Sequence, residues 1–200
     1  MRLARYHHVT NETQHRVGHR CAVIAEACRL TQNVIMFREI VSFASAASVA
    51  DWFAIDDGVM GGVSSSHMRH DPAGHAVFEG NVSLERNGGF ASVRSRPQDL
   101  TAIGATAYVL DACGDGKRYK LNLRTDDGFD GVNYQAAFDA PAGQWVTVRL
   151  AVSAFLPTFR GRLVADSPPL DPALVRQIGF MIADRQAGAF ALAIRRLHAE

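Results

Sequence analysis

Four side chains near the start of the chain could together hold a metal ion, namely those of His15, His19, Cys21 and Cys28. Imidazole and thiolate groups are the usual zinc ligands, and zinc sites recur with characteristic short spacings between them. The spacing of these four residues matches none of the paired Cys-x2–4-Cys patterns. We therefore expect no metal site here.

Candidate nucleophiles are present, but the groups that would activate them are not evident. Ser64–Ser66 fall outside a Gly-x-Ser-x-Gly elbow. His67, His70 and His75 follow closely, but their alternation and the Asp-Pro-Ala-Gly turn before the last of them are typical of a hairpin edge. Cys113 precedes a Gly-Asp-Gly turn, and no feature marks it as an activated thiolate, so we expect a packed thiol.

Two glycine-containing turns resemble nucleotide or calcium loops only in part. Gly114–Arg118 contains Gly-Lys but lacks the Gly-x4-Gly-Lys-Ser/Thr frame of a phosphate-binding loop. Asp126–Gly131 begins like a calcium loop, but Ala137 stands where that loop needs a bidentate glutamate, and Asp-Gly more often turns a hairpin. The sequence therefore predicts a protein that is not an enzyme and carries no metal and no cofactor.

The segment from Trp52 to Ser64 combines residue types that a plain turn does not need. An apolar strand leads into Asp56-Asp57, and Met60 and Gly61-Gly62 follow. Glycine permits a positive φ or a close backbone approach, and methionine is an adaptable apolar contact. We expect this segment to lie at a recognition surface.

Polar side chains share one face of three predicted strands. Alternation at period 2 places Arg94, Asn122, Arg124 and Gln135 opposite the apolar residues of their strands, so neighbouring strands would align them in a polar stripe. Solvation of one sandwich face explains such a stripe, and so does a site for a polar ligand. We expect both arginines to stay solvated and to serve recognition together with Asp57. The structural alternative is a buried ion pair between Asp57 and one of these arginines.

The elements that position these residues are expected to be short strands, because Gly, Asn, Asp and Pro divide the chain into short apolar runs. Many short strands at near-regular spacing predict an all-β sandwich or barrel. One or two short helical turns are expected, within residues 45–53 and 171–175. The predicted strands are Val77–Leu84, Ala91–Arg96, Ala105–Cys113, Tyr119–Thr125, Asn133–Phe138, Trp145–Leu150, Gln177–Ala183 and Phe190–Leu197.

The overall composition limits the kinds of partner. The chain has 200 residues, of which 48% are hydrophobic and 20% charged, as in a globular domain with a sizeable core. A net charge of +1 creates no overall field to attract nucleic acid or an anionic membrane. Charged residues interrupt the longest apolar stretches, so we expect no membrane span. Three cysteines cannot form a disulfide framework, which favours a reducing compartment.

Residues 1–35 differ from the rest of the chain. They contain five arginines against two glutamates and lack the apolar core of a secretory signal. We expect a poorly ordered leader or a mis-assigned start, followed by a single β-sandwich domain over residues 36–200. The predicted location is the bacterial cytoplasm. The alternative is the mitochondrial matrix, if the arginine-rich stretch is a transit peptide.

The segment Asp57–Ser64, with the sequence DGVMGGVS, resembles the opening signature of the complex I intermediate-associated protein family. Further blocks that resemble the family follow in order, and together they cover the chain from about Trp52 to Leu197. These blocks are Phe78–Leu84, Asn87–Arg94, Gly114–Tyr119, Tyr134-Gln135, Gly143–Trp145, Phe159–Gly161 and Ile178–Met181.

The resemblance implies both a fold and a function. The fold is a galactose-binding-like β-sandwich, or jelly roll, which agrees with the predicted strands. The mitochondrial member of the family is a chaperone-like assembly factor without catalytic activity that binds a membrane-arm intermediate of NADH:ubiquinone oxidoreductase. By this resemblance we expect a non-enzymatic module that holds an unassembled protein partner, with Asp57, Met60, Asn87 and Arg94 on or beside its contact surface.

A second class of function stays open. The polar stripe could bind a carbohydrate or another small polar molecule, with Trp52 or Trp145 as a stacking platform. The two classes differ in what the protein would capture, which is an unassembled protein in the first and a glycan in the second.

Overall fold

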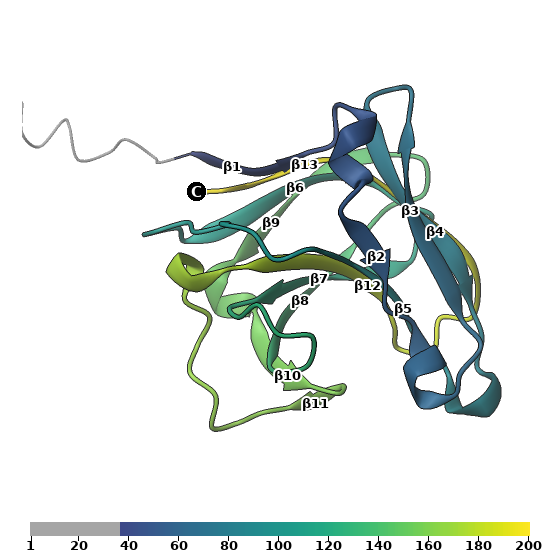
Figure 1. Ribbon diagram of the computed structural model, residues 1–200. Helices are drawn as coiled ribbons and strands as arrows, with labels where there is room; N and C mark the ends of the chain where they lie inside the picture. The colour runs from purple at the N-terminus through teal and green to yellow at the C-terminus, as the bar shows by residue number, and fades with distance from the viewer. Residues whose placement is uncertain (1–36) are drawn as a thin grey trace, which may run out of the picture. The chain divides into compact units, whose positions relative to one another are not determined.

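A computed structural model describes residues 37–200, which form two antiparallel β-sheets packed face to face (Figure 1). This architecture confirms the predicted all-β sandwich. The leader or mis-assigned start expected over residues 1–35 lies outside the described residues, and the beginning of the domain at Met36 stays a prediction.

The six-stranded sheet is organised around β13, the last strand in sequence order. β13 pairs with β4 through Gly188–Ile194, with β1 through residues 196–199, and with β6 along its other side. The strand order is β3 (Ser65–Asp71), β4 (His75–Val82), β13 (Gly188–Ala199), β6 (Ala107–Cys113) and β9 (Trp145–Ala151), with β1 (Arg38–Ser42) attached to β13.

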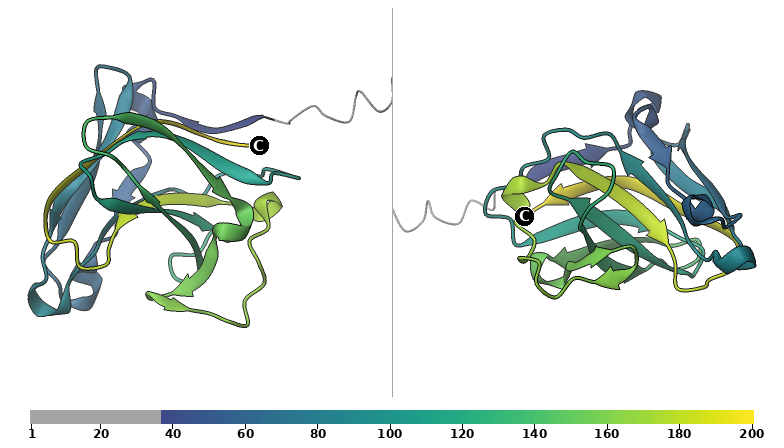
Figure 2. Two further views of the ribbon diagram at one scale, coloured as in Figure 1. Left: turned by 180° about the vertical axis from the view of Figure 1, so that it is seen from behind. Right: turned by 60° about the horizontal axis from the view of Figure 1, so that its bottom comes forward.

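The seven-stranded sheet carries all four residues of the polar stripe. Its central strands are β8, β7, β12 and β5, and its two edges are the short strands β11 and β2. The strand order is β11 (Arg162–Leu163), β10 (Leu156–Phe159), β8 (Asn133–Asp139), β7 (Arg118–Arg124), β12 (Gln177–Ile182), β5 (Ala91–Ser95) and β2 (Trp52–Ala54). The left view of Figure 2 shows the two sheets from behind as separate layers.

Short 3₁₀ helices connect the strands, and none of those in residues 37–200 is long and apolar enough to cross a membrane. They are η2 (Ala46–Val49), η3 (Asp57–Met60), η4 (Glu85–Asn87), η5 (Val152–Ala154) and η6 (Pro172–Leu174). The helical turns expected over 45–53 and 171–175 correspond to η2 and η6. Asp171 caps η6, since its carboxylate accepts a hydrogen bond from Ala173 N at 2.9 Å.

The core lies between the facing sides of the two sheets. In β7, Tyr119, Leu121 and Leu123 are fully buried, while the residues between them project to the outer face. This is the alternation that the sequence predicts. Burial of a large apolar side chain contributes about 1.5–3 kcal/mol, so these inward positions dominate the stability of the sandwich.

The sequence pattern does not predict β1, β3, β10 or β11. β3 has Met68 as its only large apolar residue and lies at a sheet edge, where burial does not impose alternation. β10 contains Pro157, which reads as a loop residue but is tolerated near a sheet edge. Within 45–53 the helical expectation is too long, because Trp52 already belongs to β2.

Candidate binding cleft

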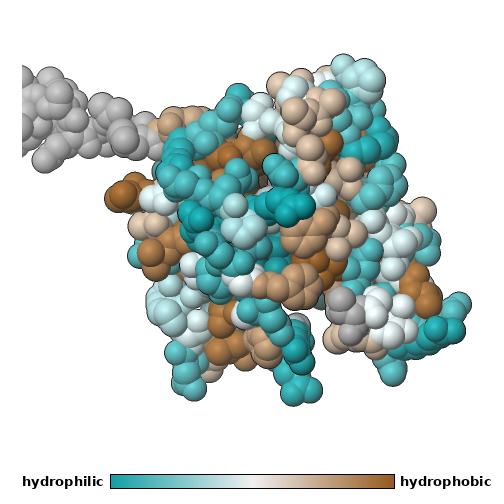
Figure 3. Space-filling model, in the orientation of Figure 1, coloured by the Kyte–Doolittle hydropathy of each residue, from teal (hydrophilic) through white to brown (hydrophobic). Residues whose placement is uncertain are grey.

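The outer face of the seven-stranded sheet is hollowed into a cleft with a volume of about 450 Å³. Strands β5, β12, β7 and β8 form its floor. Its rim consists of the β7–β8 loop (residues 125–132), the turn between β10 and β11, and Met60 of η3. Figure 3 shows the hollow at the lower edge of the molecule, between the lobe of β10 and β11 and the lobe of η3 and η4. The right view of Figure 2 brings this side forward.

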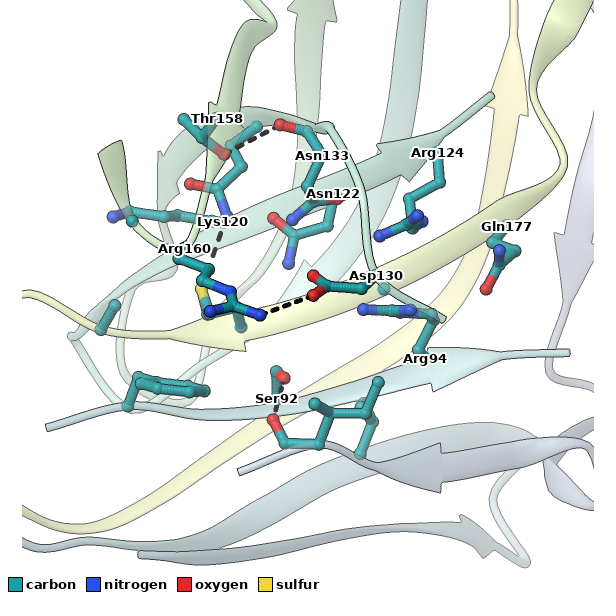
Figure 4. A pocket seen from close by; sticks show the side chains of 18 of the residues that line it. Ser92, Arg94, Lys120, Asn122, Arg124, Asp130, Asn133, Thr158, Arg160 and Gln177 are labelled. Atoms are coloured by element: carbon teal, nitrogen blue, oxygen red, sulfur yellow. Dashed lines mark hydrogen bonds and ion pairs between the residues drawn. The ribbon is translucent and has the colours of Figure 1, made fainter. Parts of the chain in front are cut away.

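Backbone pairing sets four residues in one row across the floor. Arg94 of β5 pairs with Gly179 of β12, Gly179 with Asn122 of β7, and Asn122 with Gln135 of β8. Paired residues of antiparallel strands point to the same face, so the side chains of Arg94, Asn122 and Gln135 line the cleft. Figure 4 shows the first two of them in place. Arg124 lies two residues beyond Asn122 and also lines the cleft. The structure thus brings together all four residues of the predicted stripe.

Gly179 leaves the middle of this row open. A Cβ atom at this position would lie 2.7 Å from the carbonyl oxygen of Val93 and 3.6 Å from the Cβ of Asn122. A larger residue would therefore collide with β5 and fill the floor between Arg94 and Asn122.

Four cationic side chains line the cleft, and three of them are paired with a carboxylate. The ion pairs, each 2.8 Å long, are Lys120–Asp184, Arg124–Asp126 and Arg160–Asp130. Within residues 37–200, Arg94 has no carboxylate partner. Its Nη1 donates to the carbonyl oxygen of Phe129 at 2.9 Å, and its guanidinium lies 5.6 Å from the centre of the Phe129 ring. Burial, together with the nearby charge of Arg124, lowers the pKa of Arg94 to about 10, although the more distant carboxylates of Asp126 and Asp130 raise it. At neutral pH Arg94 is therefore a cation that makes no direct ion pair within residues 37–200.

Three side chains of the floor hold the β7–β8 loop over one end of the cleft. Arg94 binds the carbonyl of Phe129, Arg124 Nη1 lies 3.4 Å from the carbonyl of Gly131, and Gln177 Nε2 lies 2.7 Å from the carbonyl of Asp126. Because these contacts come from β5, β7 and β12, the loop and its exposed Phe129 have a defined place on the rim.

Two buried polar atoms in the floor of the cleft have no hydrogen-bond partner within the described part of the chain. They are Oδ1 of Asn122, in a residue 7% exposed, and Nε of Arg124, in a residue 3% exposed. The expectation that Arg124 stays solvated is therefore wrong. Buried polar groups are normally satisfied, so an unused acceptor and an unused donor in one cleft suit a ligand that supplies their partners.

Asp57 does not lie in the cleft, and the expectation of a carboxylate exposed for recognition is wrong. Its side chain is 0% exposed. Oδ1 accepts from Ser64 N at 2.9 Å, and Oδ2 accepts from Ser64 Oγ at 2.5 Å and Gly89 N at 2.8 Å, with Phe90 N at 3.4 Å. The alternative of an ion pair with an arginine is also wrong, because its partners are amides and a hydroxyl. A Cβ at Gly62 would overlap this carboxyl group, which explains one of the two adjacent glycines.

Asp56 makes a second set of cross-strand contacts. It accepts from Ser66 N at 2.8 Å and Ser66 Oγ at 2.6 Å on β3, and from Ser92 N at 3.0 Å on β5. The paired aspartates thus tie the segment after β2 to both sheets, which is a structural role.

The acid sensitivity of the fold should depend on Asp57. Burial raises the pKa of its carboxyl, but the hydrogen bonds from Ser64, Gly89 and Phe90 outweigh burial and hold the pKa below its ordinary value of 3.8. A lowered folded-state pKa contributes stability above the unfolded pKa, and this contribution is lost as the pH falls through the folded pKa. We expect urea unfolding to show that the wild type has a higher free energy of unfolding than Asp57→Asn. This difference should be constant above about pH 5 and should become smaller below about pH 4.

The matched control is Asp166→Asn, since Asp166 is exposed and makes no side-chain hydrogen bond to residues 37–200. Its stability should follow that of the wild type across the same pH range. If the difference in the free energy of unfolding between the wild type and Asp57→Asn stays constant down to pH 2, the role assigned to the charged carboxylate is contradicted.

Three other predicted residues lie outside the cleft. Asn87 is exposed in η4 with φ +61° and does not line the cleft. Trp52 stacks on the buried ring of Phe180, with ring centres 5.6 Å apart. Trp145 lies in β9 of the other sheet beneath Arg195. Neither tryptophan can act as the stacking platform of the polar stripe, so that expectation is wrong. Met60, in contrast, is 60% exposed and lines the cleft.

The histidines singled out in the sequence lie on the β3–β4 hairpin. His67 Nε2 lies 3.2 Å from Glu79 Oε1, and the His75 ring contacts Trp145 edge-on. Within residues 37–200, no group of His, Cys, Asp and Glu side chains is placed to hold a metal ion. The candidate ligands at positions 15, 19, 21 and 28 lie outside the described residues.

Several cleft residues are missed by the sequence analysis. Alternation could have found three of them, because Ser92, Lys120 and Asn133 share faces with Arg94, Asn122 and Gln135. Most of the others come from loops, from the short strand β10 or from β12, whose place in the sheet the sequence does not indicate. These residues are Phe90, Phe129, Asp130, Thr158, Arg160, Gln177, Gly179 and Met181.

Solved structures with a similar fold include carbohydrate-binding modules. The chain is similar to the family 11 module of the cellulase Lic26A-Cel5E of Clostridium thermocellum, with a TM-score of 0.62 and 14% identity over 84% of this chain and 95% of that one. A family 11 module from the same organism in complex with a β-1,3-1,4-mixed-linked tetrasaccharide matches with a TM-score of 0.60 and 16% identity, over 82% and 94% of the two chains. At such identities the likeness shows the fold alone, which is the jelly-roll, galactose-binding-like sandwich.

Two relatives found by sequence similarity share a name that does not refer to carbohydrate binding. The chain is 26% identical to "Complex I intermediate-associated protein 30, mitochondrial" of Neurospora crassa, over 81% of this chain and 73% of the relative. It is 23% identical to the protein of the same name in Drosophila melanogaster, over 80% and 64% of the two. The family model of complex I intermediate-associated protein 30 matches residues 41–194, which is most of the described sandwich. The chain therefore belongs to the complex I intermediate-associated protein 30 family.

Proposed function

We propose that this protein is a non-enzymatic, chaperone-like module that holds a polypeptide partner in the cleft of its seven-stranded sheet, as an assembly factor for NADH:ubiquinone oxidoreductase. Membership of the family and the names of the relatives support the assembly role. The names of the two relatives favour the mitochondrial alternative for its location over the expected bacterial cytoplasm.

The observation that carries the proposal is an exposed apolar rim beside a charged floor. Met60 is 60% exposed and Phe129 is 66% exposed, and both line the same cleft. Large apolar side chains that stay exposed around a concave surface are typical of protein contact sites, where aromatic and methionine residues are enriched. A polypeptide segment would cover both residues and meet the polar floor with its backbone groups.

A carbohydrate site is the alternative, and the side chains of the cleft favour it less. Its aromatic lining consists of Phe90 and Phe129, and both tryptophans lie elsewhere. A neutral glycan would also leave the charge of Arg94 without a counter-ion, which is unfavourable in a partly desolvated position.

The test is capture of identified subunits by the full chain. A tagged full-length protein is used as bait in detergent-solubilised membranes from its own cells, and bound subunits of NADH:ubiquinone oxidoreductase are quantified by mass spectrometry. We expect the wild type to enrich these subunits and the double variant Met60→Ser/Phe129→Ser to enrich them at least tenfold less. Loss of two interface anchors commonly costs about 1–2 kcal/mol each.

The matched control is Ile103→Ser/Leu174→Ser, which removes two apolar side chains that are also more than half exposed but do not line the cleft. It should capture as well as the wild type, and all three proteins should have the same melting temperature. Failure to enrich any subunit of the complex, or equal capture by the two double variants, would overturn the proposal.

A further inference from the structure

Among residues 37–200, Arg94 is the one cation of the cleft that makes no ion pair with a carboxylate. Arg94 uses one N–H in its hydrogen bond to Phe129, whereas a guanidinium has five N–H donors. Each of the other three cations of the cleft is matched by a carboxylate. A half-buried, unmatched guanidinium is a poor structural element but a strong anchor for an incoming carboxylate, which it can bind through two parallel hydrogen bonds.

The same floor offers an acceptor that an anion cannot use. Oδ1 of Asn122 is buried without a donor in residues 37–200, and in the strand pairing it stands in the same row as Arg94, with Gly179 between them. The two strands that carry Arg94 and Asn122 are separated by two strand spacings, or about 10 Å. A ligand that satisfies both groups must present an anion and an N–H donor within that span.

We propose that the segment bound in the cleft is acidic, with an aspartate or glutamate carboxylate on Arg94 and a neighbouring backbone N–H on Asn122. Two residues of extended chain span about 7 Å, and an acidic side chain adds the remaining reach. The unpartnered Nε of Arg124 is then available to a backbone carbonyl of the same segment. This inference rests on the proposed function only in taking the ligand to be a polypeptide.

Other anions and neutral ligands fit these groups less well. A phosphate group carries a charge near −2 and mainly acceptor oxygens. It would leave Asn122 Oδ1 without a donor, whereas a peptide supplies a backbone N–H next to its carboxylate. A neutral sugar supplies hydroxyl donors but no charge for Arg94.

The test measures charge preference directly with synthetic peptides. A phage-displayed library of random nonapeptides is selected on the immobilised full chain. The best binder is then synthesised with blocked ends, as the selected peptide and with its acidic residue changed to glutamine or phosphoserine. We expect selected sequences to share an acidic residue among apolar neighbours. We also expect the change to glutamine to weaken binding at least tenfold, or about 1.4 kcal/mol.

A double-mutant cycle assigns the preference to Arg94. With Arg94→Gln, the acidic peptide and its glutamine form should bind within twofold of each other, because the partner of the carboxylate is gone. The matched control is Arg118→Gln, at the exposed start of the same face of β7 and outside the cleft, which should keep the tenfold preference. If Arg94→Gln fails to fold, Arg94→Lys replaces it. Lysine keeps the charge but loses the paired hydrogen bonds, so the preference should fall without vanishing.

Several results would overturn the inference. The first is that the selected peptides are not enriched in acidic residues. The second is that the phosphoserine peptide binds more tightly than the acidic peptide. The third is that Arg94→Gln still prefers the acidic peptide to its glutamine form tenfold. Displacement of the peptide by a mixed-linked β-glucan tetrasaccharide in an Arg94-dependent manner would also overturn it. These outcomes are separable from failure of the proposed function. Capture of complex I subunits that is insensitive to Arg94→Gln leaves the function standing, while acid-selective peptide binding without such capture leaves only the inference.

Discussion

Replacement of Asp57 by alanine is expected to lower the free energy of unfolding by about 3–5 kcal/mol. The carboxylate is 0% exposed and accepts hydrogen bonds from Ser64, Gly89 and Phe90. Alanine would leave buried N–H groups without acceptors and the turn after β2 without its attachment. For a domain of this size, the melting temperature should fall by about 6–20 °C.

The control for this experiment removes a carboxylate that makes no hydrogen bond or ion pair to residues 37–200. Asp166→Ala, at an exposed position, should change stability by less than about 0.5 kcal/mol. If Asp57→Ala melts within 2 °C of the wild type, the hydrogen bonds described for its carboxylate do not hold the turn. Its recognition role would then be open again.

Replacement of Phe180 by alanine should be about as damaging, for a different reason. The ring is fully buried on β12, the strand between β5 and β7, and it stacks on Trp52. Loss of a buried phenylalanine removes transfer free energy and leaves a cavity, which together cost about 3–5 kcal/mol. Urea unfolding should show a lower midpoint with an unchanged m-value, because the surface exposed on unfolding stays similar.

The matched substitution is Phe53→Ala in β2, where the ring is more than a third exposed. It should cost less than Phe180→Ala, about 1–2 kcal/mol, because more than a third of Phe53 stays exposed to solvent in the folded protein. If Phe180→Ala lowers the free energy of unfolding by as little as Phe53→Ala does, Trp52 and Phe180 do not form part of the core. The stacking role considered for Trp52 in the sequence analysis would then return.

The sequence could predict the faces of the strands because one side of each sheet is buried. In β7, apolar residues alternate with Lys120, Asn122 and Arg124, and this pattern alone separates core from cleft. What it could not supply is the order of the strands. β12 lies between β5 and β7, and only that placement puts Gly179 between Arg94 and Asn122.

The error over Asp57 has a physical reason. A carboxylate beside glycines and a methionine reads as accessible, because nothing nearby in sequence satisfies it except Ser64. Two of its donors, Gly89 and Phe90, follow more than thirty residues later and reach it only in the folded sandwich. Buried hydrogen-bond partners that are distant in sequence leave no local signal.

The position of β13 has a consequence for the timing of folding during synthesis. Its partners β1, β4 and β6 all precede it by many residues, and β1 pairs with it across most of the described chain. At about 5–20 residues per second, the ribosome completes β13 roughly 10–30 s after β1. Throughout that interval β1, β4 and β6 lack the strand that joins them into one sheet. The apolar faces of these strands therefore stay uncovered on the nascent chain until synthesis of the domain is almost complete.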